Sequence, residues 1–221
     1  MDTYVTIYHN LLNQNNPSKN QSDTMEILKH PMGPYQTNCY IVRIDGKEII
    51  IDPGVGATGW VIANVTHPVA ILNTHGHFDH VWSNQELKEK LKIPLYTPKD
   101  DVFLLQNSSW MADLPPSFPD VEVQGDQEYN IEGIEVKFHH FPGHCPGCSM
   151  IEIGDVMFSG DFLFHNSIGR YDFPYSSPVD MKKSLEKMRL MKEDKTLYPG
   201  HGESTTLFHE QRNVDYWLRM L

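Results

Sequence analysis

Four short apolar segments of this chain each run into a turn that carries histidine or aspartate. The first, residues 69–72, leads into Asn73-Thr-His-Gly-His-Phe-Asp-His80, which places three histidines and one aspartate within six positions. The other three turns hold the side chain beside glycine: Phe141-Pro-Gly-His144, Ser159-Gly-Asp161 and Tyr198-Pro-Gly-His201. Side chains at strand ends are held by a rigid scaffold and remain free to bind ligands. The chain is therefore expected to bring these strand ends together at a shared cleft.

The side chains in these turns are of the types that bind metal ions. Five imidazoles and two carboxylates are present, namely His75, His77, His80, His144, His201, Asp79 and Asp161. A zinc ion takes about four protein ligands at a structural site and about three plus water at a catalytic site. Two ions bridged by Asp161 would each receive three or four donors and leave room for a shared water, as in two-metal hydrolases with ions ~3.5 to 4 Å apart. We therefore expect two divalent metal ions, with zinc favoured and iron or manganese as alternatives, since these donors suit all three.

Apolar runs alternate with glycine-containing turns along most of the chain, which predicts a mixed α/β fold. Strands are expected at residues 26–31, 38–44, 48–51, 69–72, 93–96, 121–123, 134–139, 150–153, 156–158 and 196–198. Helices are expected at residues 58–65, 84–91, 99–106, 178–191 and 206–219. The pattern contains no linker, so residues 25–221 are expected to form one domain of two sheet-forming halves flanked by helices.

Residues 1–24 differ from the rest of the chain. Asparagine and glutamine dominate residues 10–22, with neither a strand nor a helix period. We expect a flexible extension or an expression remnant, with Met25 as a candidate native start. Residues 4–8 nevertheless have enough β-propensity to add an edge strand.

The composition excludes several classes of protein. A net charge of −11 disfavours DNA or RNA as the main partner, because nucleic-acid affinity comes largely from lysine and arginine. No apolar run approaches the ~20 residues that span a bilayer, and no secretory signal opens the chain. Three cysteines do not make a disulfide framework. We expect a cytoplasmic protein that acts on a small molecule, with neither membrane nor nucleic-acid partners and an oligomeric state that the sequence leaves open.

The string Thr74-His-Gly-His-Phe-Asp-His80, followed in order by His144, Asp161 and His201, resembles the metallo-β-lactamase superfamily from about Met25 to the C-terminus. Its closest likeness is to the glyoxalase II-like, or hydroxyacylglutathione hydrolase-like, branch in its short single-domain form. The resemblance implies a four-layer αββα sandwich with a dinuclear site at one edge of the sheets. It also implies ligand roles: His75, His77 and His144 on one metal, Asp79, His80 and His201 on the other, and Asp161 between them. Asp52 matches a position that supports the ligands by hydrogen bonds.

The expected reaction is hydrolysis of a thioester, S-lactoylglutathione or a related acyl thioester. Two divalent cations lower the pKa of a bridging water so that hydroxide exists at neutral pH, and they polarise the carbonyl. A thiol with a pKa of about 8.5 leaves readily without a general acid. Asp79 could also accept a hydrogen bond from the attacking water and is the expected catalytic residue.

The substrate side of the resemblance is less complete. Full-length glyoxalase II enzymes carry a C-terminal helical domain that contacts glutathione, and this chain ends soon after His201. Arg170 and Tyr171 align with the family segment that meets glutathione and are the candidate substrate-binding residues. A salt bridge between Arg170 and Asp172 is the alternative role for that arginine. The segment also resembles persulfide dioxygenases, which use a single iron, and this oxidoreductase is the main alternative; a nuclease, lactonase or β-lactamase of the superfamily is less favoured.

The remaining cysteines and histidines are expected to have structural roles, and several aromatic residues are candidates for the wall of the cleft. Cys145-Pro-Gly-Cys148 could be a redox pair, extra metal ligands or small residues packing a turn, and the packing interpretation is favoured because a strand follows the pair instead of a helix. Cys39 is expected in the core. The histidines outside the turns are expected to bind no metal, with His165 as the best candidate exception. Aromatic candidates for the cleft wall are Trp82, Trp110, Phe162, Phe164 and Tyr171.

Overall fold

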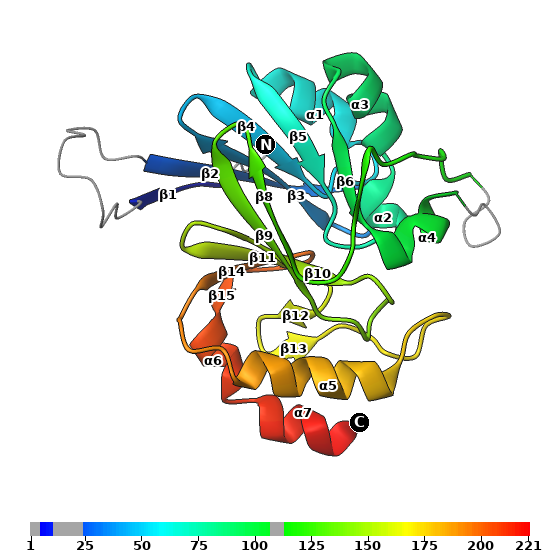
Figure 1. The fold of residues 1–221 in the computed structure, drawn as a ribbon, viewed down its shortest axis with the longest axis vertical. Helices are drawn as coiled ribbons and strands as arrows, with labels where there is room; N and C mark the ends of the chain where they lie inside the picture. Colours follow the sequence, from blue (N-terminus) through cyan, green and yellow to red (C-terminus); the bar gives the residue numbers. More distant parts are fainter. Residues whose placement is uncertain (1–4, 11–23, 107–112) are drawn as a thin grey trace.

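The computed structural model describes residues 5–10, 24–106 and 113–221. Two β-sheets pack face to face, and helices cover the outer face of each sheet (Figure 1). This is the four-layer αββα sandwich that the sequence predicts. No helix in the described ranges has both the length and the apolar character needed to cross a bilayer.

The larger sheet is built by the N-terminal half of the chain. Its seven strands follow chain order, antiparallel from β1 to β4 and parallel from β4 to β7. The first two parallel connections each carry a helix that packs on the outer face of the sheet. The strands are β1 (Val5–Asn10), β2 (Thr24–Met32), β3 (Thr37–Ile44), β4 (Lys47–Ile51), β5 (Pro68–Leu72), β6 (Leu95–Pro98) and β7 (Val121–Val123).

The smaller sheet is built by the C-terminal half. Its order is β15-β14-β11-β10-β9-β8, with only the β11–β14 pair parallel. The strands are β8 (Gln127–Ile131), β9 (Ile134–His140), β10 (Ser149–Ile153), β11 (Val156–Gly160), β14 (Thr196–Pro199) and β15 (Thr205–Thr206). A separate two-stranded hairpin, β12 (Leu163–Phe164) and β13 (Ser167–Ile168), follows β11.

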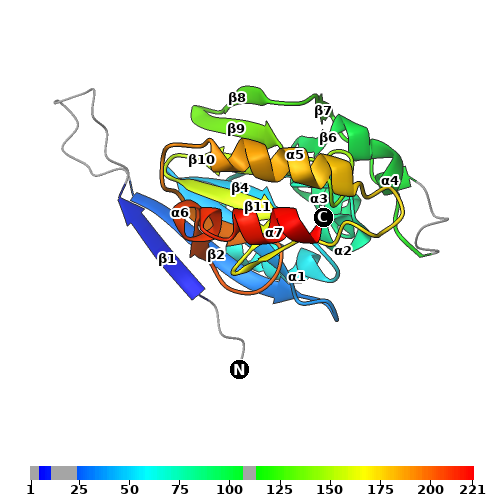
Figure 2. The ribbon, with the colours of Figure 1, turned by 90° about the horizontal axis from the view of Figure 1, so that it is seen from below.

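The helices divide between the two outer faces. Helices α5 and α7 lie side by side on the outer face of the smaller sheet, below it in Figure 1 and in front of it in Figure 2. The short α2 and α4 lie at the end of the larger sheet where β5 and β6 finish (Figure 1). The helices are α1 (Ala57–Asn64), α2 (Phe78–Val81), α3 (Asn84–Leu91), the 3₁₀ turn η1 (Lys99–Asp101), α4 (Val102–Gln106), α5 (Pro178–Arg189), α6 (Leu207–Gln211) and α7 (Val214–Met220).

Alternation along the strands accounts for the layers. In β4, Ile49 and Ile51 join the core between the sheets while Ile50 faces α1 and α3. In β10, Ile151 enters the same central core while Met150 packs against α5 and α7. Successive strand residues point to opposite faces, so strands covered on both sides are apolar throughout. This explains why the sequence shows continuous apolar runs in its central strands.

The structure differs from the predicted elements mainly where polar residues form strands. Strand β8 was not predicted because its sequence, QEYNI, is mostly polar and exposed at the sheet edge. The predicted helix over 206–219 is divided into α6 and α7, because Asn213 N–H donates to Glu210 O three residues back. The hairpin β12–β13 and helix α2 were also missed, since each is too short to show a period.

The N-terminal segment lies partly within the described residues. Val5–Asn10 forms strand β1 and pairs antiparallel with β2 at the sheet edge. This agrees with the β-propensity of residues 4–8. A flexible extension over residues 1–24 stays a prediction, because residues 1–4 and 11–23 lie outside the described ranges.

Candidate metal centre

Three histidines from two loops form one cluster. His75 and His77 follow β5, and His144 lies in the loop after β9. One ring nitrogen from each lies within 4.8 Å of the others. The rings stand nearly perpendicular, with centroids 4.8 Å apart for His75–His77 and 4.5 Å for His77–His144. Three imidazoles directed at one point match the ligand set of a divalent metal ion.

A second cluster lies beside the first. Asp79 and His80 come from the single turn of α2, and His201 follows β14, in the other sheet. His80 Nε2 lies 3.6 Å from Asp79 Oδ2, and His201 Nε2 lies 3.4 Å from the same oxygen. Helix α2 begins directly after His77. His77 therefore belongs to the first cluster, whereas Asp79 and His80, inside the helix, belong to the second.

Asp161 stands between the two clusters. Its Oδ2 lies 3.5 Å from His144 Nε2 and 3.4 Å from His201 Nε2, and its Oδ1 lies 3.3 Å from His80 Nε2. Contacts from both sides make it the carboxylate that could bridge two ions. The structure thus brings all seven predicted side chains together, and their roles as ligands are a proposal.

The outer ring nitrogens show which histidine tautomers are present. His144 Nδ1 donates to the backbone oxygen of Arg170 at 2.7 Å, and His201 Nδ1 donates to that of Tyr35 at 3.1 Å. A carbonyl only accepts, so in these rings Nδ1 carries a proton and a neutral ring keeps a lone pair on Nε2. Metal-binding histidines are oriented in this way.

Several ring nitrogens and a carboxylate oxygen that face the centre of the two clusters have no hydrogen-bond partner in the described part of the chain. Among the described residues, His75 Nε2, His80 Nε2, His144 Nε2 and Asp161 Oδ1 are buried without an acceptable hydrogen bond. Buried polar atoms are almost always satisfied, so several orphans facing one point indicate an absent partner. A pair of cations would satisfy them, and the residues present therefore fit a dinuclear site.

The pKa shifts of the histidines have opposite directions in the two clusters: the pKa is lowered in the first cluster and raised at His201 in the second. Burial lowers the pKa of His75 well below its usual value and that of His77 to about 3, which keeps both imidazoles neutral. Burial also acts to lower the pKa of His201, but Asp161 and Asp79 outweigh it and raise the pKa to about 9. In the metal-free protein the second cluster thus holds protons where cations would bind.

Asp52 supports both clusters from beneath. It lies at the end of β4, buried, with Oδ1 accepting from Thr74 N at 2.8 Å and Oδ2 accepting from Thr74 Oγ1 at 2.6 Å. His80 Nδ1 lies 3.0 Å from Oδ2, and Thr74 Oγ1 lies 3.1 Å from His75 Nδ1. One carboxylate therefore contacts an imidazole of one cluster directly and reaches an imidazole of the other through Thr74; its role in supporting metal ligands stays a prediction.

Glycine is required where the loops meet. A Cβ on Gly200 would lie 2.2 Å from Asp161 Oδ1, and one on Gly160 would lie 2.4 Å from Thr74 Oγ1. The backbone of Gly160 also has φ +51°, which favours glycine. These positions explain the Gly-Asp and Gly-His pairs in the sequence.

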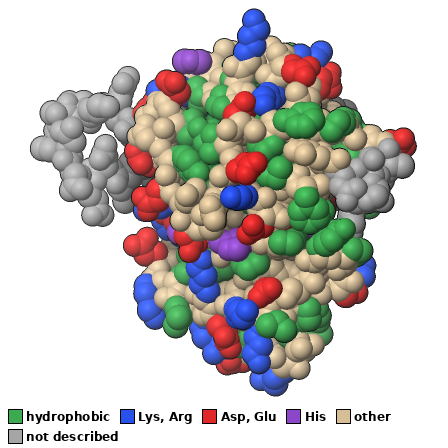
Figure 3. All heavy atoms as spheres, turned by 45° about the vertical axis from the view of Figure 1, so that its right-hand side comes forward, with side chains coloured by type: hydrophobic (Ala, Val, Ile, Leu, Met, Phe, Trp, Pro, Cys, Tyr) green, Lys and Arg blue, Asp and Glu red, His purple; other side chains and the backbone are tan. Residues whose placement is uncertain are grey.

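A pocket of about 550 Å³ opens over the clusters, within the usual size range of small-molecule sites. Aromatic and aliphatic side chains form its walls, and the proposed ligands form its floor. The lining residues other than ligands are Tyr35, Phe78, Phe164, Ile168, Arg170 and Phe173. On the face drawn in Figure 3, a histidine and charged side chains are exposed near the boundary of the two halves, with hydrophobic side chains beside them.

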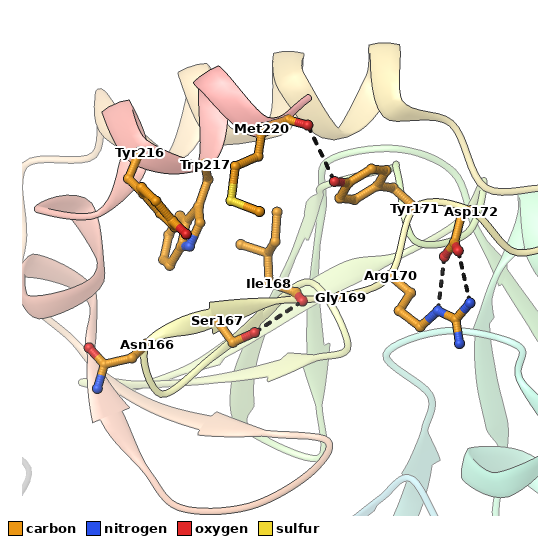
Figure 4. A pocket seen from close by; sticks show the side chains of 10 residues that line it. All are labelled: Asn166, Ser167, Ile168, Gly169, Arg170, Tyr171, Asp172, Tyr216, Trp217 and Met220. Carbon is orange, nitrogen blue, oxygen red and sulfur yellow. Dashed lines mark hydrogen bonds and ion pairs between the residues drawn. The ribbon is translucent and has the colours of Figure 1, made fainter.

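A neighbouring pocket of about 550 Å³ lies between the β13 segment and α7 (Figure 4). Arg170 lines both pockets and donates from Nε and Nη2 to the two oxygens of Asp172, at 2.9 and 2.8 Å. Tyr171 lines only the neighbouring pocket, and its hydroxyl points to Met220 O. Arg170 therefore lines the metal pocket and also forms the salt bridge with Asp172 that was its alternative role. Tyr171 does not line the metal pocket.

Some side chains of the site carried no sequence signal. Thr37 at the start of β3 donates from Oγ1 to Asp79 Oδ2 at 2.7 Å, and its backbone bridges to His201. Phe173 packs edge-on to His77 and His144. Such contacts arise between distant segments, and no spacing rule would find them.

The other predicted wall and histidine residues have mixed outcomes. Phe164 lines the metal pocket, whereas Phe162 is buried in the core and Trp82 packs beside Val81. Trp110 lies outside the described residues. His165 is exposed in the β12–β13 turn, where its ring lies tilted beside that of His209 with centroids 5.5 Å apart, and it does not line the metal pocket.

The interpretation of Cys145 and Cys148 as packing residues was incomplete. The structure joins them in a disulfide with Cα atoms 5.3 Å apart, and both are buried. The tight Pro-Gly turn brings the two sulfurs together without a helix, so the strand that follows the pair was no argument against a disulfide. Cys39 is buried in the core as expected.

Comparisons with known proteins agree with this geometry. The family model of the metallo-beta-lactamase superfamily matches residues 32–201, and the chain belongs to that superfamily. An uncharacterized protein of Aquifex aeolicus is 35% identical over 193 residues, covering 82% of this chain and 92% of that protein. Hydroxyacylglutathione hydrolase GloC of Haemophilus influenzae is 31% identical, covering 86% and 96%.

Solved structures give the same result. The chain is similar to the BLEG-1 B3 metallo-beta-lactamase, with a TM-score of 0.77, 29% identity, and coverage of 86% of this chain and 99% of that one. It is also similar to TTHA1623 in a di-iron-bound form, with a TM-score of 0.72, 32% identity, and coverage of 83% and 96%. Superfamily membership together with the histidine and aspartate clusters supports a metal-dependent hydrolase.

Proposed function

We propose that this chain hydrolyses an acyl thioester at a dinuclear metal site, with S-lactoylglutathione or a related compound as substrate. The observation that carries the proposal is the meeting of two ligand triads at Asp161, on the floor of a largely apolar pocket. The similarity to hydroxyacylglutathione hydrolase GloC supports a thioester substrate.

The proposed ligands are His75, His77 and His144 for one ion and Asp79, His80 and His201 for the other, with Asp161 shared. Two divalent ions held there would supply an activated water at neutral pH and an electrophile for the carbonyl oxygen. Zinc is the favoured metal, and iron or manganese suits the same nitrogen and oxygen donors. A complete second triad speaks against the single-iron persulfide dioxygenase.

Asp79 is positioned to orient the attacking water. Thr37 donates to its Oδ2, and burial alone would raise the pKa of this carboxyl, but His80 and hydrogen bonds from His201 and Thr37 lower it to about 2. An ionised carboxylate at this position accepts a hydrogen bond and cannot act as the acid for a leaving group.

A thiolate leaving group suits the remaining pocket walls. Apart from the proposed ligands, Tyr35 and Arg170 are the titratable side chains that line the pocket within the described residues. A phenol and a guanidinium are both poor proton donors to a leaving group at neutral pH. A thiol with a pKa of about 8.5 leaves as the thiolate anion without a general acid. An alkoxide is a much poorer leaving group and needs a general acid to protonate it.

The test is a substrate panel on protein stripped with a chelator and reloaded separately with zinc, iron or manganese. We expect cleavage of S-lactoylglutathione or another acyl thioester only after reloading, with the matched oxygen ester much slower. Intact thioesters at full metal loading would overturn the proposal. Oxygen uptake with glutathione persulfide would favour the dioxygenase, and cleavage of RNA, a lactone or a β-lactam would favour those relatives. A cytoplasmic location and the lack of membrane and nucleic-acid partners stay predictions.

A further inference from the structure

Three buried groups outside the proposed ligands lie beside the loops that carry the first histidine triad. They are Asp101 at the end of the 3₁₀ turn η1 and the cysteines Cys145 and Cys148, with ligand-type atoms within 4.8 Å of one another. Cys145 directly follows His144 in the chain. The proposed mechanism uses none of the three.

Asp101 ties together the two loops that carry the triad. Its Oδ2 accepts from the backbone N–H of Gly76, between His75 and His77, at 2.9 Å. Its Oδ1 accepts from the N–H of Gly147, in the loop of His144, at 2.6 Å. Both loops approach Asp101 so closely that a Cβ on either glycine would lie 2.7 Å from an atom of this residue. A shift of this carboxylate would therefore move one loop relative to the other.

The contact between Asp101 and Cys145 depends on the oxidation state of the sulfur. Cys145 Sγ lies 3.0 Å from Asp101 Oδ2, within reach of a thiol hydrogen bond. A thiol donates its proton to the carboxylate, which then has three donors. A disulfide sulfur has no proton, so the carboxylate keeps two donors and faces a sulfur lone pair. Burial raises the pKa of Asp101 to about 7 despite the two backbone donors, which indicates that its charge is weakly supported.

We propose that Cys145 and Cys148 form a reversible thiol–disulfide switch that acts through Asp101 on the metal-binding triad His75, His77 and His144. A small dithiol reduces the pair: its two thiols supply two electrons and two protons, the Cys145–Cys148 bond breaks, and the reductant closes to its own cyclic disulfide. In the dithiol state the Asp101 carboxylate accepts hydrogen bonds from Gly76 N–H, Gly147 N–H and the Cys145 thiol, which fixes the two ligand loops relative to each other. In the disulfide state the thiol donor is lost, so the carboxylate fixes the loops less firmly.

The switch requires a reciprocal linkage between sulfur chemistry and metal binding. If reduction raises the affinity of the first site for a metal, then loading that site must favour the dithiol by the same factor. We expect a factor of about fivefold or more, the usual lower range for coupled sites.

The test measures both sides of the linkage on the full chain. Zinc affinity is measured by competition with a chromophoric chelator, for the protein equilibrated anaerobically at defined ratios of reduced to oxidised dithiothreitol. Alkylation and mass analysis count thiols with and without zinc, and buried Cys39 supplies a constant third thiol. Cobalt in place of zinc reports the geometry of the histidine site through its absorption spectrum. Equal affinities, an unshifted dithiol fraction and one common cobalt spectrum would overturn the proposal.

Two single variants separate the hydrogen bond from the disulfide. Cys148→Ser prevents the disulfide and keeps the Cys145 thiol on Asp101, so it is expected to match the reduced protein in zinc affinity without a reductant. Cys145→Ala also prevents the disulfide but removes the donor, and is expected to bind the first zinc about fivefold or more weakly than Cys148→Ser. Equal affinities of the two variants would refute the role of Asp101.

Asp101→Asn should abolish the difference between oxidised and reduced protein, while Asp100→Asn, at the exposed neighbour, should keep it. An additional zinc equivalent, bound only by the reduced protein and lost in Cys148→Ser, would also overturn the proposal, because the sulfurs would then be direct ligands. The inference rests on the proposed metal site and does not depend on the substrate. A protein that binds two zinc ions but cleaves no thioester would refute the proposed activity and leave the switch intact.

Discussion

Replacing Asp52 by asparagine should weaken binding of a metal ion while the chain stays folded. The carboxylate receives three donors, from Thr74 N, Thr74 Oγ1 and His80 Nδ1. Asparagine has the same shape, but one of its two terminal atoms donates instead of accepting. If the amide oxygen keeps the Thr74 N–H, the amide NH₂ faces His80 Nδ1 and favours the tautomer with a proton on Nε2. That proton would occupy the lone pair that the metal needs.

The magnitude follows from two separate terms. Losing a partner that orients a metal-bound histidine lowers metal affinity by about 10- to 100-fold. At saturating metal this removes about 1.4 to 2.7 kcal/mol of the stabilisation that the metal gives the folded state. The mismatched buried donors destabilise the metal-free protein by a further ~1 to 3 kcal/mol.

Denaturant unfolding with and without zinc separates the two terms, and a chelator competition measures the affinity directly. Asp45→Asn is the matched control, because Asp45 and Asp52 have similar positive φ values, 51° and 49°, so the backbone effect of asparagine is shared. The control should retain full zinc affinity. If Asp52→Asn bound both ions as tightly as the unchanged protein, the account of how His80 is oriented would be refuted.

Further substitutions test the site, the surface and the pocket. In Gly200→Ala the new Cβ would lie 2.2 Å from Asp161 Oδ1, so metal analysis should show loss of at least one zinc equivalent, and two full equivalents would contradict the geometry. Contacts with His139 and with Lys195 lower the pKa of Glu152 to about 2, so the Glu152 carboxylate stabilises the fold above pH 4.5 and loses its effect as the pH falls through 2. Glu152→Gln should therefore be about 0.5 kcal/mol less stable at pH 6, allowing for solvent screening, with the difference gone near pH 2 in urea titrations. Arg170→Ala should raise KM for an anionic thioester about fivefold and leave kcat unchanged, and an unchanged KM would remove Arg170 from the substrate site.

The seven side chains that meet in the structure could be found from the sequence because each lies in a segment that follows an apolar strand, and four of them directly follow a glycine. The sheet fixes the positions of the strand ends, and this determines where His144 after β9 and Asp161 after β11 lie. The layers were equally predictable, since continuous apolar runs such as residues 49–51 require cover on both faces.

The rest depended on contacts between segments distant in the chain. Thr37 reaches Asp79 across 42 positions, and Asp101 reaches Gly147 across 46. Neither residue belongs to a motif, and a buried aspartate is indistinguishable from an exposed one in the sequence. Strand β8 was missed because an edge strand needs few apolar residues to pair.

The central claim is tested most directly by a crystal of the metal-replete protein with anomalous scattering data collected at the zinc edge. We expect two peaks ~3.5 to 4 Å apart, one beside His75, His77 and His144, the other beside Asp79, His80 and His201, with the Asp161 carboxylate between them. A single peak in excess zinc, with the imidazoles of either cluster turned away from the pocket, would contradict the account.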